Sequence, residues 1–147
     1  MVLSGSLRLS DNHARRTRGR FNVLINDNVT VFKRYFGADL FPGSLNVDVP
    51  KPSSLQSNLD AGQPTPSIII PKSELVNMPG YLGNGQAWPC SIRGPKFPKP
   101  VECWMFRRIG SIVPPGVIEL VAQNKLREVY GLQHGDPITI DVFAKSA

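Results

Sequence analysis

Alternating apolar and polar residues predict β-strands over much of this 147-residue chain. In residues 44–49, SLNVDV, the odd positions are apolar and the even positions are polar, so a strand here presents two different faces. Residues 2–9 and 20–25 predict two strands joined as a long hairpin. We expect further strands over residues 67–72, 88–92, 101–109, 117–121 and 138–142.

Residues 28–37, NVTVFKRYFG, have a different period and predict a short amphipathic helix. Four apolar residues recur at helical spacing: Val29, Phe32, Tyr35 and Phe36. Gly37 suits the end of this helix because glycine adopts positive φ readily. We expect this stripe to pack in the core rather than to stack on a base.

A second short helix is predicted over residues 125–130, KLREVY, with Asn124 as its cap and Gly131 as its end. Lys125 and Arg127 fall in its first turn, where cations oppose the helix dipole. Such an arrangement is tolerable where an anion binds. The residues alone leave two interpretations open, an anion site or two cations in solvent.

Two polar stretches predict loops. Residues 50–66 are punctuated by prolines and are expected to form a surface loop. Residues 10–20 cannot pack in a core because they carry four arginines: Arg15, Arg16, Arg18 and Arg20. They form either a basic loop in solvent or a loop that closes over phosphates, whose oxygens match the guanidinium fork.

Composition favours a single mainly β domain over residues 1–147, because 14 prolines and 13 glycines imply many turns and few long helices. The net charge of +6 favours a polyanionic partner, whether nucleotide, nucleic acid or acidic surface. Cys90 and Cys103 match neither a metal-ligand spacing nor a disulfide-rich pattern. Without an apolar run near 18 residues or a signal peptide, the sequence predicts a soluble, cytoplasmic protein.

Two features carry candidate chemistry. Ser44, Asn46 and Asp48 share one face of their predicted strand, and such oxygen donors either bind a hard cation such as Mg²⁺ or simply face solvent. Glu119 interrupts an apolar strand, and an acid in such a run needs a partner.

Two longer motifs, GADLFPGSLNVDV and GVIELVAQNKLREVYGLQHGDPITIDV, resemble the archaeal CTP-dependent riboflavin kinases. This resemblance implies a six-stranded cradle-loop-type β-barrel with two short helices that phosphorylates riboflavin to FMN. It also implies that Ser44 and Asn46 bind Mg²⁺ beside the nucleotide phosphates, and that Ser111 and Glu119 contact the flavin. It further implies that the residues after the predicted strand 117–121 contact the nucleotide: Asn124, Lys125, Leu126 and Arg127.

The resembling family also has a glycine-rich loop, G-x-G-x-G-[RK], around the nucleotide. This sequence keeps only Gly19 and Arg20 of it and has SDNHARRTR in place of the rest. The resemblance implies a mechanism in which Lys125, Arg127 and Arg20 neutralise the phosphates while Glu119 orients or deprotonates the attacking hydroxyl. Two alternatives remain: a barrel that binds nucleotide or flavin without chemistry, and a barrel that binds nucleic acid.

Overall fold

The computed structural model describes residues 1–9, 22–50, 54–111, 113 and 116–143. Its strands are β1 (Val2–Leu7), β2 (Leu45–Asp48), β3 (Ile68–Ile70), β4 (Gly85–Arg93), β5 (Val101–Arg108), β6 (Val117–Val121) and β7 (Pro137–Val142). Its helices are α2 (Val29–Phe36), α3 (Leu55–Asp60), α4 (Leu126–Val129) and the 3-10 turn η1 (Lys72–Glu74), and residues 22–27 are also helical.

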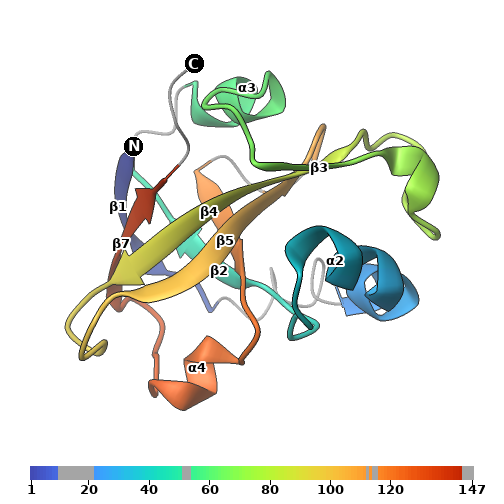
Figure 1. Cartoon of the computed structure of the whole chain (residues 1–147). Coiled ribbons are helices and arrows are strands. Elements are labelled where there is room, and N and C mark those ends of the chain that lie inside the picture. The colour runs from blue at the N-terminus through green and yellow to red at the C-terminus, as the bar shows by residue number, and fades with distance from the viewer. Residues whose placement is uncertain (10–21, 51–53, 112, 114–115, 144–147) are drawn as a thin grey trace.

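Six of the strands close into an antiparallel barrel (Figure 1). Their order is β4-β5-β6-β2-β1-β7, and β7 pairs back onto β4. Strand β4 pairs with two strands along one edge: its first residues pair with β3 and its last residues pair with β7. The predicted six-stranded β-barrel is thus confirmed, and β3 is an additional strand on its rim. No helix in the described parts of the chain is long and apolar enough to cross a membrane.

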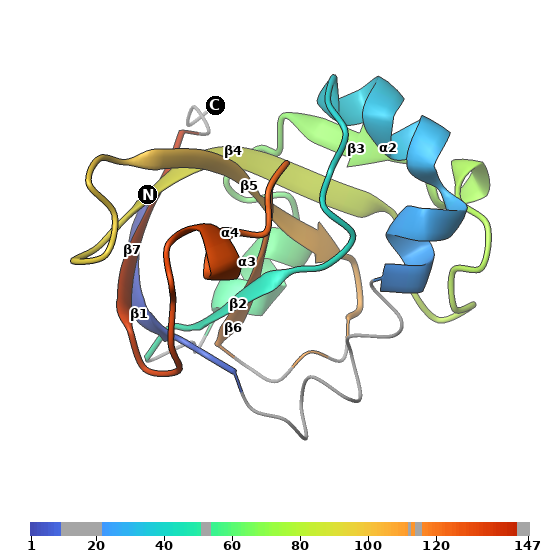
Figure 2. The ribbon, with the colours of Figure 1, turned by 90° about the horizontal axis from the view of Figure 1, so that it is seen from below.

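The barrel interior is filled by every second residue of the strands, as the alternation predicts. Trp88 is fully buried there, and its indole N–H donates a 2.7 Å hydrogen bond to the carbonyl of Pro64. Leu59 of α3 and Leu126 of α4 belong to the same core. The two helices lie at opposite ends of the barrel, as Figure 1 and the perpendicular view in Figure 2 show together.

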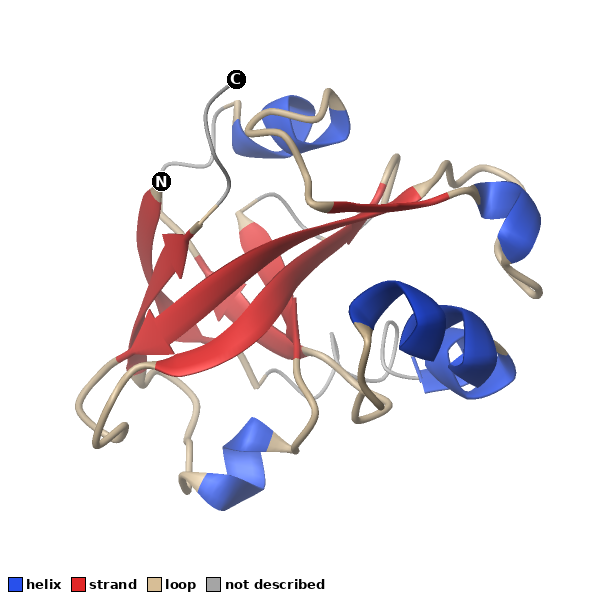
Figure 3. Ribbon diagram, viewed as in Figure 1, coloured by secondary structure: helices blue, strands red, loops and turns tan. Residues whose placement is uncertain are grey.

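A second core lies between the outer wall of the barrel and the helical layer that contains α2 (Figure 3). Phe36 packs edge-on against Trp104, with ring centroids 5.2 Å apart, and Phe32 packs against Phe106 at 5.8 Å. Gly37 ends α2 with a positive φ of 70°, as expected. Strands β5 and β6 therefore have one face in the barrel core and the other partly covered by helices.

The strand expected over residues 20–25 is wrong, because residues 22–27 are helical; residues 20 and 21 lie outside the described part. Leu24, Ile25 and Asn28 are all buried, which is a helical spacing. The Asn28 amide donates to the Leu24 carbonyl and accepts from the Val76 backbone N–H, both at 2.8 Å. The short alternation in this segment was therefore misleading.

Two further expectations are corrected. Residues 50–66 do not form only a loop, since they contain α3, which buries Leu59 against the barrel. Asn124 does not cap α4, because Lys125 occupies the cap position and no side chain there bonds to the helix end. The described chain accordingly has more short helices than the two expected.

Candidate active site

One row of side chains crosses three strands on the outer wall of the barrel. Asn46 of β2 pairs directly with Glu119 of β6, and Glu119 pairs with Phe106 of β5. Ile118 and Leu120, on either side of Glu119, point into the barrel core, so alternation places Glu119 on the outer wall. Directly paired residues have Cβ atoms about 4.5–5.5 Å apart. The sequence-distant Asn46 and Glu119 are therefore immediate neighbours.

Ser44 and Asn46 form a compact pair of oxygen donors. The Ser44 hydroxyl donates a 2.9 Å hydrogen bond to Oδ1 of Asn46. Asp48, the third polar residue of this face, instead forms a 3.0 Å ion pair with Arg8. A hydroxyl and an amide oxygen suit Mg²⁺, which prefers oxygen ligands and keeps several waters or phosphate oxygens. No group of three His, Cys, Asp or Glu side chains that could hold a metal occurs among the described residues.

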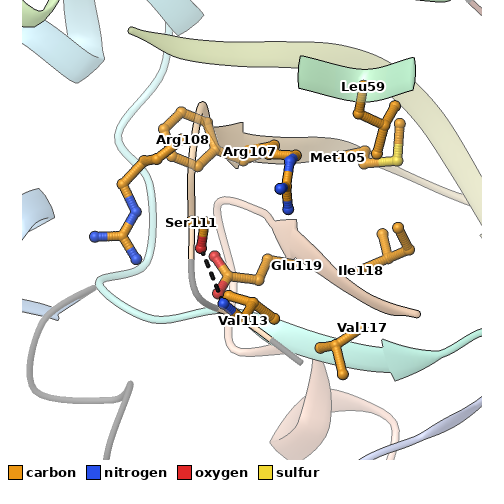
Figure 4. A pocket seen from close by; sticks show the side chains of 10 residues that line it. Leu59, Met105, Arg107, Arg108, Ser111, Val113, Val117, Ile118 and Glu119 are labelled. Carbon is orange, nitrogen blue, oxygen red and sulfur yellow. Dashed lines mark hydrogen bonds between the residues drawn. The ribbon is translucent and has the colours of Figure 1, made fainter. Parts of the chain in front are cut away.

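A pocket opens where β5 and β6 separate (Figure 4). Their ladder ends at the pair Phe106 and Glu119, although β5 continues to Arg108 and β6 begins at Val117. The pocket has an empty volume of about 280 Å³, including the solvent at its mouth. Its lining residues are Leu59, Met105, Phe106, Arg107, Arg108, Ser111, Val113, Val117, Ile118 and Glu119. The Ser111 hydroxyl accepts a 3.3 Å hydrogen bond from the Val113 backbone N–H.

Glu119 is the acidic residue of this pocket, and only 6% of its surface is exposed. Burial raises its pKa above the usual value of 4.5, and the positive charges of Arg108 and then Arg107 partly oppose that increase. A carboxylate with a raised pKa is a better proton acceptor near neutral pH than an exposed one. The site therefore contains a group suited to general-base chemistry.

Arg107 and Arg108 are adjacent in sequence but extend in different directions (Figure 4). Arg107 makes two hydrogen bonds to the Asp60 carboxylate, from Nε at 2.6 Å and from Nη2 at 3.1 Å. This ion pair ties the end of α3 to the rim of the pocket. Arg108 lies on the same wall as Phe106 and Glu119, since side chains alternate along β5.

The segment expected to bind nucleotide runs beside the chain that leads into β2. The Phe41 backbone N–H donates a 2.8 Å hydrogen bond to the Ala122 carbonyl, which extends the contact between β2 and β6. The ammonium group of Lys125 lies 5.7 Å from the centre of the Phe41 ring and 2.9 Å from Oε1 of Glu128. Leu126 is buried in the barrel core. Its side chain is thus structural, and only its backbone is available to a ligand.

The structure thus brings several predicted site residues close together. Ser44, Asn46 and Glu119 are neighbours on one wall, and Ser111 and Glu119 line one pocket. That pocket does not include Ser44, Asn46 or residues 124–127. Gly19 and Arg20 lie outside the described residues.

Sequence analysis missed three residues of the pocket region: Asp60, Arg107 and Arg108. The only signal was a pair of arginines at the end of an apolar strand, CWMFRR. Arginines are rarely buried, so a buried strand that ends in two of them indicates an anionic partner nearby.

A hydroxyl and an amide oxygen beside a buried carboxylate, with arginines at the edge of a pocket, suit an enzyme that handles phosphate groups. Comparison with known proteins identifies the class more closely. A family model named for CTP-dependent riboflavin kinases, and described as domain of unknown function DUF120, matches residues 16–142. The chain belongs to this family, and the expectation of a kinase-type phosphotransferase is confirmed.

Individual relatives agree with this assignment. A riboflavin kinase of Sulfolobus acidocaldarius is 31% identical over 127 residues, which cover 85% of this chain and 74% of that protein. A riboflavin kinase of Sulfurisphaera tokodaii is also 31% identical over 127 residues, or 85% of this chain and 86% of that protein. That of Saccharolobus solfataricus is 29% identical over 110 residues, covering 75% and 58% respectively.

Proposed function

We propose that this protein transfers the γ-phosphate of CTP to the 5′-hydroxyl of riboflavin, giving FMN and CDP. Its relatives are named riboflavin kinases, and its family is named for CTP dependence. The observation that carries the proposal is the direct pairing of Asn46 with Glu119, which sets a cation ligand beside a buried carboxylate. Phosphoryl transfer needs such an arrangement because the protein mainly positions the reactants and stabilises charge.

Each residue then has a distinct role. Ser44 and Asn46 hold Mg²⁺, which when bound neutralises charge on the triphosphate. Glu119 orients the riboflavin hydroxyl and accepts its proton as the new O–P bond forms and the bond from the γ-phosphorus to the β,γ-bridging oxygen breaks. Ser111 binds at the phosphate end of the flavin, and Lys125 and Arg127 neutralise the nucleotide phosphates.

Arg20 and Gly19 complete the nucleotide site in this proposal. Arg20 precedes Asn22 by two residues, and a Cβ added to Gly43 would lie 3.3 Å from Oδ1 of Asn22. Gly43 in turn directly precedes Ser44, so this part of the helical layer adjoins the cation ligands. In this proposal the guanidinium of Arg20 binds the phosphates that backbone N–H groups of a glycine-rich loop would otherwise bind. A long arginine side chain reaches phosphate oxygens without close approach of the backbone.

The proposal is tested by following FMN formation with riboflavin, Mg²⁺ and either CTP or ATP. We expect turnover with CTP, and we expect Asn46→Ala to lower it about 100-fold or more while leaving the circular dichroism spectrum unchanged. Thr30→Ala, on the exposed side of α2, is the control and should retain full turnover. Undiminished FMN formation in Asn46→Ala would contradict the cation assignment. Binding of CTP and riboflavin without turnover would instead identify a non-catalytic barrel.

A further inference from the structure

Arg108 lies on the outer wall beside Glu119, at the pocket of the proposed site. It is two residues beyond Phe106 on β5, so it lies diagonally across from Glu119 on the outer wall. Such diagonal neighbours are about 7–8 Å apart, a distance that an arginine side chain can span. Asn46 is the next residue along the same row, one further strand away. The side chain of Arg108 thus starts at the pocket and next to Glu119, whose partner on the following strand is Asn46.

The environment of Arg108 differs from that of its neighbour. Arg107 points to the other side of β5 and is held by both oxygens of Asp60. Arg108 lines the pocket with only 5% of its surface exposed, on the same face of the sheet as Glu119. A guanidinium removed from water interacts more strongly with an anion than an exposed one does. Arg108 is therefore placed to meet a phosphate at the pocket, on the face of β5 that adjoins Glu119.

We propose that Arg108 is a catalytic residue that binds the phosphoryl group during its transfer and then the phosphate of FMN. The inference rests on the proposed riboflavin kinase activity and adds a phosphate ligand to it. A planar guanidinium can bind two of the three equatorial oxygens over which the transferring group spreads its charge in the transition state. Riboflavin has no such group, so Arg108 distinguishes the product from the acceptor.

The experiment compares the binding of FMN and riboflavin, measured by flavin fluorescence, with steady-state turnover. Arg108→Gln should weaken FMN binding about 10- to 100-fold, as expected for losing hydrogen bonds to a charged group, and change riboflavin binding less than about 3-fold. It should lower kcat about 100- to 1,000-fold with little change in the KM for riboflavin. Arg108→Lys keeps the charge without the fork and should be intermediate in both assays.

Arg93→Gln is the matched control, because Arg93 is an arginine at the far end of β4 from Gly85, which pairs with Arg108. Arg93 is eight positions beyond Gly85 along β4, about 26 Å away. Its side chain is 55% exposed and pairs with Asp141, so the variant should bind both flavins and turn over as the wild type does. Thermal unfolding establishes whether each variant is folded. If Arg108→Gln does not fold, the comparison of FMN and riboflavin binding is made with Arg108→Lys.

Equal weakening of FMN and riboflavin in the Arg108 variants would overturn the inference, because it would indicate a purely structural role. Unchanged kcat would overturn it as well. These results differ from failure of the proposed function, which would appear in the wild type as absent FMN formation with every nucleotide donor. If the wild type binds neither flavin, both proposals are wrong.

Discussion

Gly5 of β1 lies against the backbone at the end of β2, and its substitution by alanine tests how closely the two strands pack there. A Cβ at this position would lie 2.1 Å from the carbonyl oxygen of Asp48 and 2.9 Å from Cγ1 of Val47. The first obstacle is backbone rather than the end of a flexible side chain. The two strands must therefore move apart by about 1 Å before alanine fits.

The structure allows the cost to be estimated. The β1–β2 ladder has only two register pairs, Ser6 with Asp48 and Leu7 with Val47, so the displacement acts on a short contact. Overpacking of this kind costs about 1–3 kcal/mol, and a weakened strand hydrogen bond adds about 1 kcal/mol. We expect Gly5→Ala to lower the free energy of unfolding by about 2–4 kcal/mol and Tm by roughly 5–15 °C.

Urea unfolding followed by tryptophan fluorescence measures the change. Gly80→Ala is the control, since a Cβ at Gly80 meets nothing within 4 Å and Gly80 has no positive φ. Alanine there should be neutral, or stabilising by up to about 1 kcal/mol, because it restricts the unfolded chain. If Gly5→Ala unfolds at the same urea concentration as the wild type and Gly80→Ala, the reasoning about strand closeness is refuted.

Two further predictions concern the pocket. Asp60→Asn removes the charge that holds the buried Arg107 and should lower the free energy of unfolding in urea by about 1.5–3 kcal/mol. Asp141→Asn, whose partner Arg93 is exposed, should lower it by at most about 1 kcal/mol. Equal losses would contradict a stabilising role for the Asp60–Arg107 ion pair. Glu119 must be ionised to accept a proton, and burial raises its pKa above 4.5. As the pH is lowered, kcat should therefore begin to fall at a pH higher than 4.5. Glu119→Gln should lose this acidic limb along with most activity, and a limb that persists would exclude Glu119 as the base.

Local periodicity predicted most of the strands, since each needs only its own residues to alternate. It failed for residues 22–27, where Val23, Leu24 and Ile25 look like strand but Leu24 and Ile25 pack in the helical layer. Strand propensity is weak compared with such tertiary packing. Helix α3 was not predicted because Leu59 is its only buried residue, and a single buried residue gives no repeating pattern that indicates a helix.

The candidate site could be predicted only where its geometry is local. Ser44 and Asn46 share a face because they are two residues apart in one strand, which the sequence already indicates. The pairing of Asn46 with Glu119 depends on the register between β2 and β6, and 73 positions separate the two residues in the chain. The position of Arg108 at a pocket depends on where the pairing of β5 and β6 ends. Such relations depend on long-range strand pairing, which residue patterns do not record.

The proposed catalytic groups Asn46 and Glu119 lie on the outer wall of the barrel, while the strands are held together by the core inside it. A substitution inside the barrel that preserves volume, such as one at Ile92 or Ile138, which do not line the pocket, can change the free energy of unfolding without contacting Asn46 or Glu119. Thermal tolerance and chemical specificity can consequently be adjusted on separate sides of the same strands. A variant library confined to inward-facing positions away from the pocket would vary stability and leave specificity nearly constant.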